Sequence, residues 1–101
     1  MTLTLNTRLQ TNPDVIVTEV TDSEGRPEAV LLNVATHKYF SLNASGVCIW
    51  KALERREPLA AAVADLTARF EVSPEQAEAS VLRLAGELSA TELVKPVHEP
   101  R

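Results

Sequence analysis

The chain has 101 residues, of which 45% are hydrophobic and 24% charged, and its formal net charge is −4. This length suits one compact domain, and the negative charge disfavours nucleic acid, whose phosphates select basic surfaces. A single cysteine excludes a disulfide or a thiolate metal cluster within one chain, and no stretch approaches the about 20 apolar residues of a membrane span. We therefore expect a cytoplasmic protein with no cofactor or metal, and without nucleic-acid or membrane partners.

The first third of the chain reads as strands separated by turns. Residues 1–14 alternate leucine with polar residues and are expected to form an N-terminal arm or a weak edge strand. Val15–Val20 is rich in β-branched residues, which favours a first strand, and Glu28–Ala35 reads as the second. Gly25 and Pro27 between them are typical of a turn.

The next stretch joins the strands to the helices. Lys38–Leu42 is the predicted third strand, reached by a tight turn at Thr36-His37. Strands that follow one another in sequence usually pair, so we expect an antiparallel meander with Lys38–Leu42 at an edge. Asn43 is suited to cap a helix, and the apolar residues that follow it, among them Trp50, recur at helical spacing.

Two further helices are predicted. Pro58 fits the first turn of one, whose apolar stripe runs to Phe70. Ser73–Gln76 then combines a Ser cap, a Pro at the first helical position and a Gln three residues after the cap, which marks the start of another helix. Pro96 forbids its continuation, and residues 96–101 are expected to be a flexible tail.

Catalytic chemistry finds little support in the sequence. His37 and His98 are too few and too far apart for a typical metal site. Cys48 stands between apolar residues with no base or cation beside it, so a packed, unreactive thiol is expected. We therefore predict that the protein is not an enzyme.

The last two helices resemble a helix-turn-helix, so a winged-helix DNA-binding regulator is one alternative. A recognition helix should present basic or amide side chains to bases and phosphates. This helix instead carries Glu75, Glu78 and Glu87 against Arg83. Charge therefore disfavours DNA binding.

The exposed edge of the predicted third strand suggests another function. An edge strand has unpaired backbone donors and acceptors, so an added peptide strand can bind there. Leu82, Ala85 and the aliphatic parts of Arg83 and Lys38 are candidates to line a pocket beside it. The competing interpretation is that Leu82 and Tyr39 simply complete the core.

A family resemblance favours the first interpretation. The segments VLLNVATHKYFSLNASGVCIW, ARFEVSPEQ and SVLRLAGELSATELV resemble the PqqD-like family, the precursor-peptide recognition elements of ribosomal peptide natural-product pathways. The resemblance covers about Val15 to Val94, and Leu-Asn followed by Ile-Trp is its most specific part. The chain departs from the pattern at Ala35-Thr36-His37, which lacks the glycine that many members have before the strand. The matching residues are Tyr39, Leu42, Asn43, Gly46, Ile49, Trp50, Phe70, Val81, Leu84, Leu88 and Leu93.

The resemblance implies an α+β, winged-helix-like domain over residues 15–95, with a three-stranded antiparallel sheet followed by three helices. It implies that the leader segment of a precursor peptide docks as an extra strand on the third strand, against the third helix. Like the stand-alone proteins of lasso-peptide clusters, the chain would deliver the precursor to a leader peptidase and a cyclase. A chaperone role for a radical maturase, as in pyrroloquinoline quinone assembly, is the alternative.

Carried over by position, the resemblance divides the candidate residues into three groups. The alternation of a strand puts Tyr39 and Phe40 on opposite faces, and both are kept as candidates. The core group is Leu42, Ile49, Trp50, Val81, Leu84 and Leu88, the docking strand is Lys38, Tyr39, Phe40 and Ser41, and the helix side of the groove is Glu78, Leu82, Arg83 and Ala85.

Overall fold

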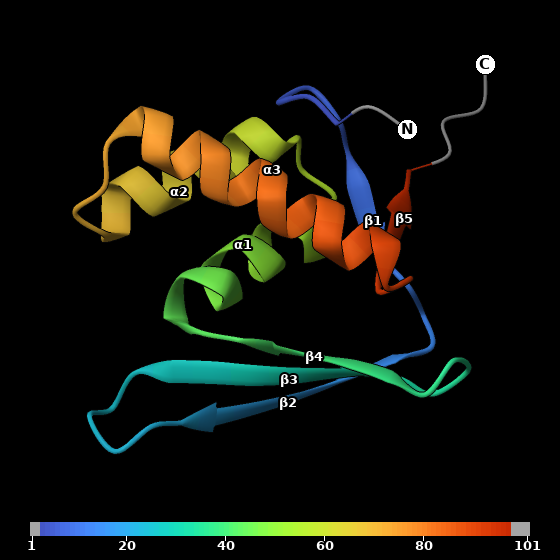
Figure 1. The fold of residues 1–101 in the computed structure, drawn as a ribbon. Helices are drawn as coiled ribbons and strands as arrows, with labels where there is room; N and C mark the ends of the chain where they lie inside the picture. The colour runs from blue at the N-terminus through green and yellow to red at the C-terminus, as the bar shows by residue number, and fades with distance from the viewer. Residues whose placement is uncertain (1–2, 98–101) are drawn as a thin grey trace.

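A computed structural model describes residues 3–97 (Figure 1). Within them, three strands followed by three helices confirm the predicted α+β fold, and one short strand is added at each end. The expected tail at residues 98–101 lies outside the described residues. The elements are β1 Leu9–Thr11, β2 Val15–Thr21, β3 Pro27–Asn33, β4 Lys38–Leu42, α1 Ala44–Glu54, α2 Leu59–Arg69, α3 Pro74–Ala90 and β5 Val94–Pro96.

The three-stranded sheet is an antiparallel meander in the order β2-β3-β4. Its helices all lie on one side (Figure 1), so the face that carries Leu31 and Leu42 is buried. Successive side chains of a strand point to opposite faces, and the other face is left open, with Ile16, Leu32 and Tyr39 aligned across it and exposed. Within residues 3–97, no strand pairs with the outer edge of β4.

In the turn from β3 to β4, where this chain lacks the glycine of the family pattern, one residue adopts the left-handed backbone conformation. His37 has a φ of 63°, in the region that favours glycine. Asn33 stabilises this turn, because its Oδ1 accepts hydrogen bonds from the backbone N–H groups of Ala35 and Thr36 at 2.9 and 3.2 Å. The chain therefore keeps the turn by side-chain hydrogen bonds to the backbone.

Local signals fix the helix starts. The Asn43 side chain accepts from the Gly46 N–H at 2.9 Å, as the sequence predicts. Ser73 and Gln76 form the predicted capping box. Pro58, predicted to lie in the first turn of the helix, is instead the N-cap of α2 with an extended ψ of 152°, and the helix begins at Leu59.

The two ends of the described chain pair with each other. β1 and β5 form a separate two-stranded antiparallel sheet beside the end of α3 (Figure 1). The predicted tail boundary at residue 96 is therefore wrong, because Pro96 lies opposite Leu9 and the Val97 N–H donates to the Arg8 carbonyl oxygen at 3.1 Å. Proline is tolerated there because an edge strand has N–H positions that need no partner.

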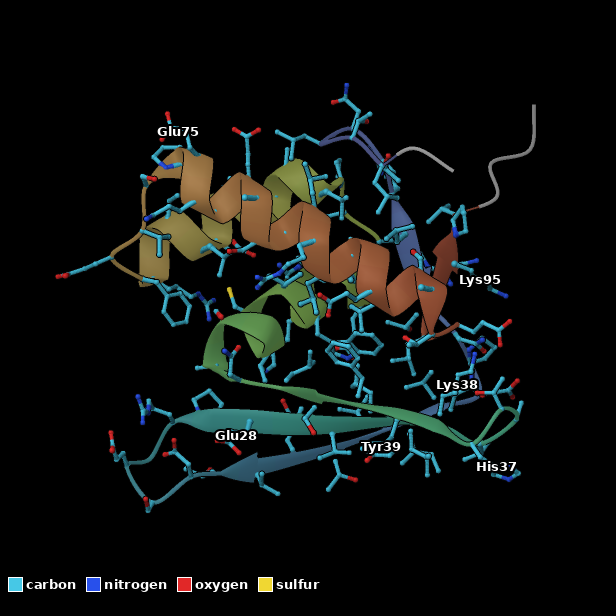
Figure 2. All side chains as sticks on the ribbon, in the orientation of Figure 1. Glu28, His37, Lys38, Tyr39, Glu75 and Lys95 are labelled. Atoms are coloured by element: carbon cyan, nitrogen blue, oxygen red, sulfur yellow. The ribbon has the colours of Figure 1, made fainter. Side chains whose placement is uncertain are left out.

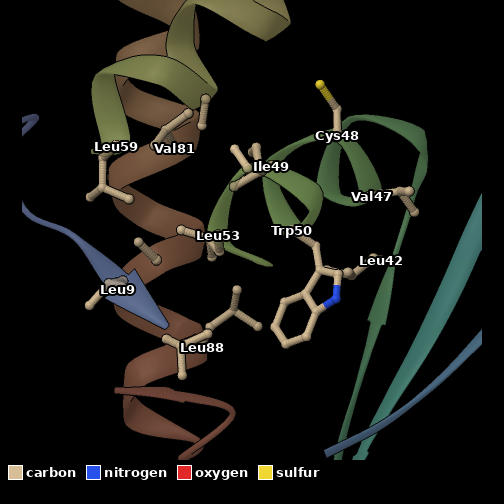
Figure 3. Packing of buried hydrophobic residues seen from close by; sticks show 14 of the residues in the cluster. Leu9, Leu42, Val47, Cys48, Ile49, Trp50, Leu53, Leu59, Val81 and Leu88 are labelled. Carbon is tan, nitrogen blue, oxygen red and sulfur yellow. The ribbon is translucent and has the colours of Figure 1, made fainter. Parts of the chain in front are cut away.

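The core lies between the sheet and the helices and is centred on α1 (Figure 3). Trp50 is 3% exposed and lies with Leu42 on its sheet side. The predicted core group is buried except for Leu84, which is half-buried. In the described part of the chain, the helices are all too short or too polar to cross a membrane.

Candidate functional site

A groove of about 410 Å³ runs between β4 and α3. One wall is the strand and the start of α1, and the other wall is one face of α3. We call it the β4–α3 groove, and its lining residues are Glu28, Phe40, Ser41, Leu42, Asn43, Ser45, Gly46, Ile49, Ser80, Arg83, Leu84 and Glu87.

The strand wall follows from the alternation of β4. Phe40 is half-buried and faces the helices, as does Leu42 at the end of the strand. Tyr39 is 71% exposed on the opposite face of the sheet, among the exposed apolar side chains (Figure 2). In an antiparallel strand, alternate residues direct N–H and C=O towards each neighbour, so the edge of β4 leaves half of its backbone groups without a strand partner in residues 3–97.

The helix wall follows from the period of α3. Ser80, Arg83, Leu84 and Glu87 are spaced by three, one and three residues, which places them on one face. The Arg83 and Glu87 side chains approach to 3.9 Å, both well exposed, so this ion pair adds little to stability. The wall is therefore mixed in character, with one apolar residue, one hydroxyl and one charge of each sign.

The structure brings three of the eight predicted site residues to the groove, namely Phe40, Ser41 and Arg83. Lys38 and Tyr39 belong to the edge strand but do not line the groove. Sequence reasoning missed Ser80 and Glu87, which are three and four residues from Arg83, and it placed Leu84 in the core group, although Leu84 is four residues from Ser80 and three from Glu87.

The other three predicted residues point elsewhere. Ala85 is fully buried among the core residues and cannot reach a ligand. Glu78 and Leu82 each lie two residues from Ser80, which is about 200° around a helix of 3.6 residues per turn, so they are on the far side of α3 from the groove. The placement of Glu78, Leu82 and Ala85 at the groove is therefore corrected.

Two further features bear on chemistry at the site. Burial raises the pKa of the Cys48 thiol, against the opposing effect of Arg69, so a reactive thiolate is disfavoured. In the described residues, no cluster of three or more His, Cys, Asp or Glu side chains is placed to hold a metal ion.

Residues 28–94 match the family model described as coenzyme PQQ synthesis protein D (PqqD). None of the curated proteins compared with the chain matches it. A solved structure of TbiB1 in complex with the TbiA(beta) leader peptide is similar, with 26% identity, a TM-score of 0.75, and coverage of 89% of this chain and 99% of that one. A lasso peptide synthetase B1 complexed with the leader peptide shares the fold, with 22% identity, a TM-score of 0.69, and coverage of 88% and 99%.

Proposed function

Because the chain belongs to the PqqD family, we propose that it binds the leader segment of a ribosomally made precursor peptide and does not itself catalyse a reaction. The observation that carries the proposal is the β4–α3 groove beside an edge strand with no strand partner in residues 3–97. TbiB1, which shares 26% of its sequence with this chain, binds a leader peptide. The leader is proposed to add as a strand to β4.

Approximate free energies can be assigned to the contributions that strand addition makes to binding. Four to six strand hydrogen bonds contribute about 1 kcal/mol each, and one or two buried apolar side chains about 1.5–3 kcal/mol each. Ordering an unstructured leader costs about 2–5 kcal/mol, and association carries its own cost. The gains and the costs are of similar size, so we expect modest affinity, which suits a carrier that must release its cargo.

Binding alone does no chemistry, so the proposal includes delivery. By holding the leader, the protein raises the effective concentration of the rest of the precursor at an enzyme bound to both. The proposed recipients are a leader peptidase and a cyclase of the lasso-peptide type. The family description favours a second candidate, a chaperone for a radical enzyme in quinone cofactor assembly.

The DNA-binding alternative is weaker. α3 carries Glu75, Glu78 and Glu87, and Arg83 is its single basic residue. Such a helix repels phosphate. Duplex binding that weakens steeply with salt would favour this alternative over peptide binding.

Strand addition has a signature that can be measured. Peptides of about 16 random residues, displayed on phage, are selected on the wild-type protein, and the tightest binder is synthesised with one N-methyl group at each position in turn. Since an added strand donates every second N–H to β4, affinity should fall about fivefold, the equivalent of one hydrogen bond, at alternate positions.

A pair of variants locates the site. Ser80→Trp fills the β4–α3 groove, whereas Ala79→Trp places the same ring on an exposed position of the same helix. The first should weaken binding of the selected peptide at least tenfold and the second should not. The proposal fails if selection yields no binder, if the N-methyl series shows no alternation, or if Ser80→Trp binds as the wild type does.

A further inference from the structure

A second cavity, of about 550 Å³, lies at the Leu42 end of the groove. We infer that it is an anchor site for a bulky apolar side chain of the bound peptide, beyond the segment that pairs with β4; the inference rests on the proposed function. We call it the corner cavity. Its lining residues are Asp22, Arg26, Pro27, Glu28, Asn43, Ala44, Ser45, Leu66, Phe70, Val72, Ala77 and Ser80.

The corner cavity continues the groove. Glu28, Asn43, Ser45 and Ser80 line both hollows, so the two are directly adjacent. Glu28 lies towards one end of the sheet and His37 at the other (Figure 2), so a peptide that follows β4 away from His37 reaches the cavity directly. An extended chain advances about 3.3 Å per residue, so a side chain just past the paired segment is the one proposed to enter the cavity.

The apolar residues that line part of the corner cavity favour an apolar side chain as the ligand. Leu66, Phe70, Val72 and Ala77 form the side contributed by the corner between α2 and α3. Phe70 is half-buried and Val72 is 36% exposed, so apolar surface is available to a ligand. Burial of such surface is favourable by about 25 cal/mol per Å².

Asp22 and Arg26, two of the three charged residues in the lining, are already paired with each other. Asp22 Oδ1 accepts from the Glu24 and Arg26 N–H groups at 2.8 and 2.9 Å, and its Oδ2 accepts from Arg26 Nε at 3.1 Å. The Arg26 guanidinium also lies 3.0 Å from the Glu24 carboxylate. A charged ligand group that binds Asp22 or Arg26 would have to break this pairing, which favours an apolar side chain on the wall formed by Leu66, Phe70, Val72 and Ala77.

An anchor would perform a task that strand pairing cannot. A peptide can shift by two residues along an edge strand, keeping its hydrogen bonds and the faces of its side chains. One bulky side chain in a cavity past the strand end makes one register better than the others. The corner cavity is thus the element that would set which residues of the precursor are presented to an enzyme.

The test is a double-mutant cycle on the phage-selected peptide. Each peptide residue is replaced by alanine, and binding is measured to the wild type, to Val72→Glu and to the control Val34→Glu. Val34 is similarly exposed, at 44%, but lies in the turn at the other end of the sheet. Trp50 fluorescence during urea unfolding verifies that each variant is folded.

We expect one apolar residue, just past the N-methyl-sensitive segment, whose replacement weakens binding to the wild type and to Val34→Glu at least tenfold. Its replacement should change binding to Val72→Glu less than threefold, while the alternating N-methyl pattern persists in that variant. Persistence of the pattern without this coupling would overturn the anchor and leave strand addition intact. Absence of the pattern in the wild type would overturn both.

Discussion

Asn33 Nδ2 donates a hydrogen bond of 2.9 Å to the Glu92 carbonyl oxygen and thereby connects the end of β3 to the segment that follows α3. These residues are 59 positions apart in the chain, and Asn33 is 1% exposed. The bond ties together the sheet and the helix that form the two walls of the β4–α3 groove. Because the same side chain accepts from the Ala35 and Thr36 N–H groups, Asn33 fixes the entry to β4 as well.

Asn33→Ala should therefore lower the free energy of unfolding by about 2–4 kcal/mol, since it removes three part-buried hydrogen bonds that contribute about 0.5–1.5 kcal/mol each. Asn12→Ala is the matched control, because Asn12 Nδ2 donates to the same carbonyl oxygen at 3.1 Å from a more accessible position. We expect the control to cost about 1 kcal/mol or less. Urea unfolding followed by Trp50 fluorescence measures both, and equal losses would contradict the role given to Asn33.

His37 gives a prediction of opposite sign. A left-handed residue other than glycine costs about 1–2 kcal/mol. Replacement by glycine removes this cost, but it also raises the conformational entropy of the unfolded chain, which offsets part of the gain. His37→Gly should therefore stabilise the protein by up to about 1 kcal/mol, whereas Ala35→Gly, at a position of negative φ in the same turn, should destabilise it by about 0.5–1 kcal/mol. Thermal unfolding of both variants decides the matter, and a loss of stability in His37→Gly would contradict it.

Features of this fold that depend on residues close together in the sequence could be predicted, whereas contacts between distant segments could not. Asn43 and Ser73 cap helices through residues three positions away, so their roles follow from the sequence. The pairing of Leu9 with Pro96 joins the two ends of the chain through strands of three residues, and a proline there normally argues against a strand. Nothing in either segment alone indicates the other.

The same contrast holds for the groove. The edge position of β4 follows from the order of the strands, and it places Phe40 and Ser41 in the strand wall. The helix wall depends on the rotation of α3 about its axis, where one residue corresponds to about 100°. Leu82 and Leu84 are both half-buried leucines, and only the packing of the fully buried Ala85 and Val81 shows which of them faces β4.

The hairpin between β2 and β3 should respond to acid. The Arg26 N–H holds the pKa of Asp22 below its ordinary value, helped by the Glu24 N–H and the Arg26 guanidinium and opposed by partial desolvation. A lowered pKa in the folded state adds stability that is present above the unfolded pKa of about 3.9 and is lost as pH falls through the folded value. Asp22→Asn should thus be less stable than the wild type at pH 7, and the difference should shrink below about pH 4. Urea unfolding at a series of pH values measures it, and a difference independent of pH would contradict the assignment.

Trp50 is buried, and its indole Nε1 has no hydrogen-bond partner in the described part of the protein. Trp50→Ala should cost about 3–5 kcal/mol through lost packing and the cavity left behind. Trp50→Phe keeps a ring between α1 and the sheet and removes a donor whose burial without a partner costs about 1–3 kcal/mol. We therefore expect the Phe variant to lose less than half as much stability as the Ala variant, measured by far-ultraviolet circular dichroism in urea because both lack the single tryptophan. Nearly equal losses would indicate that the indole N–H is satisfied in solution, for example by a buried water, and that its hydrogen bond contributes to the core.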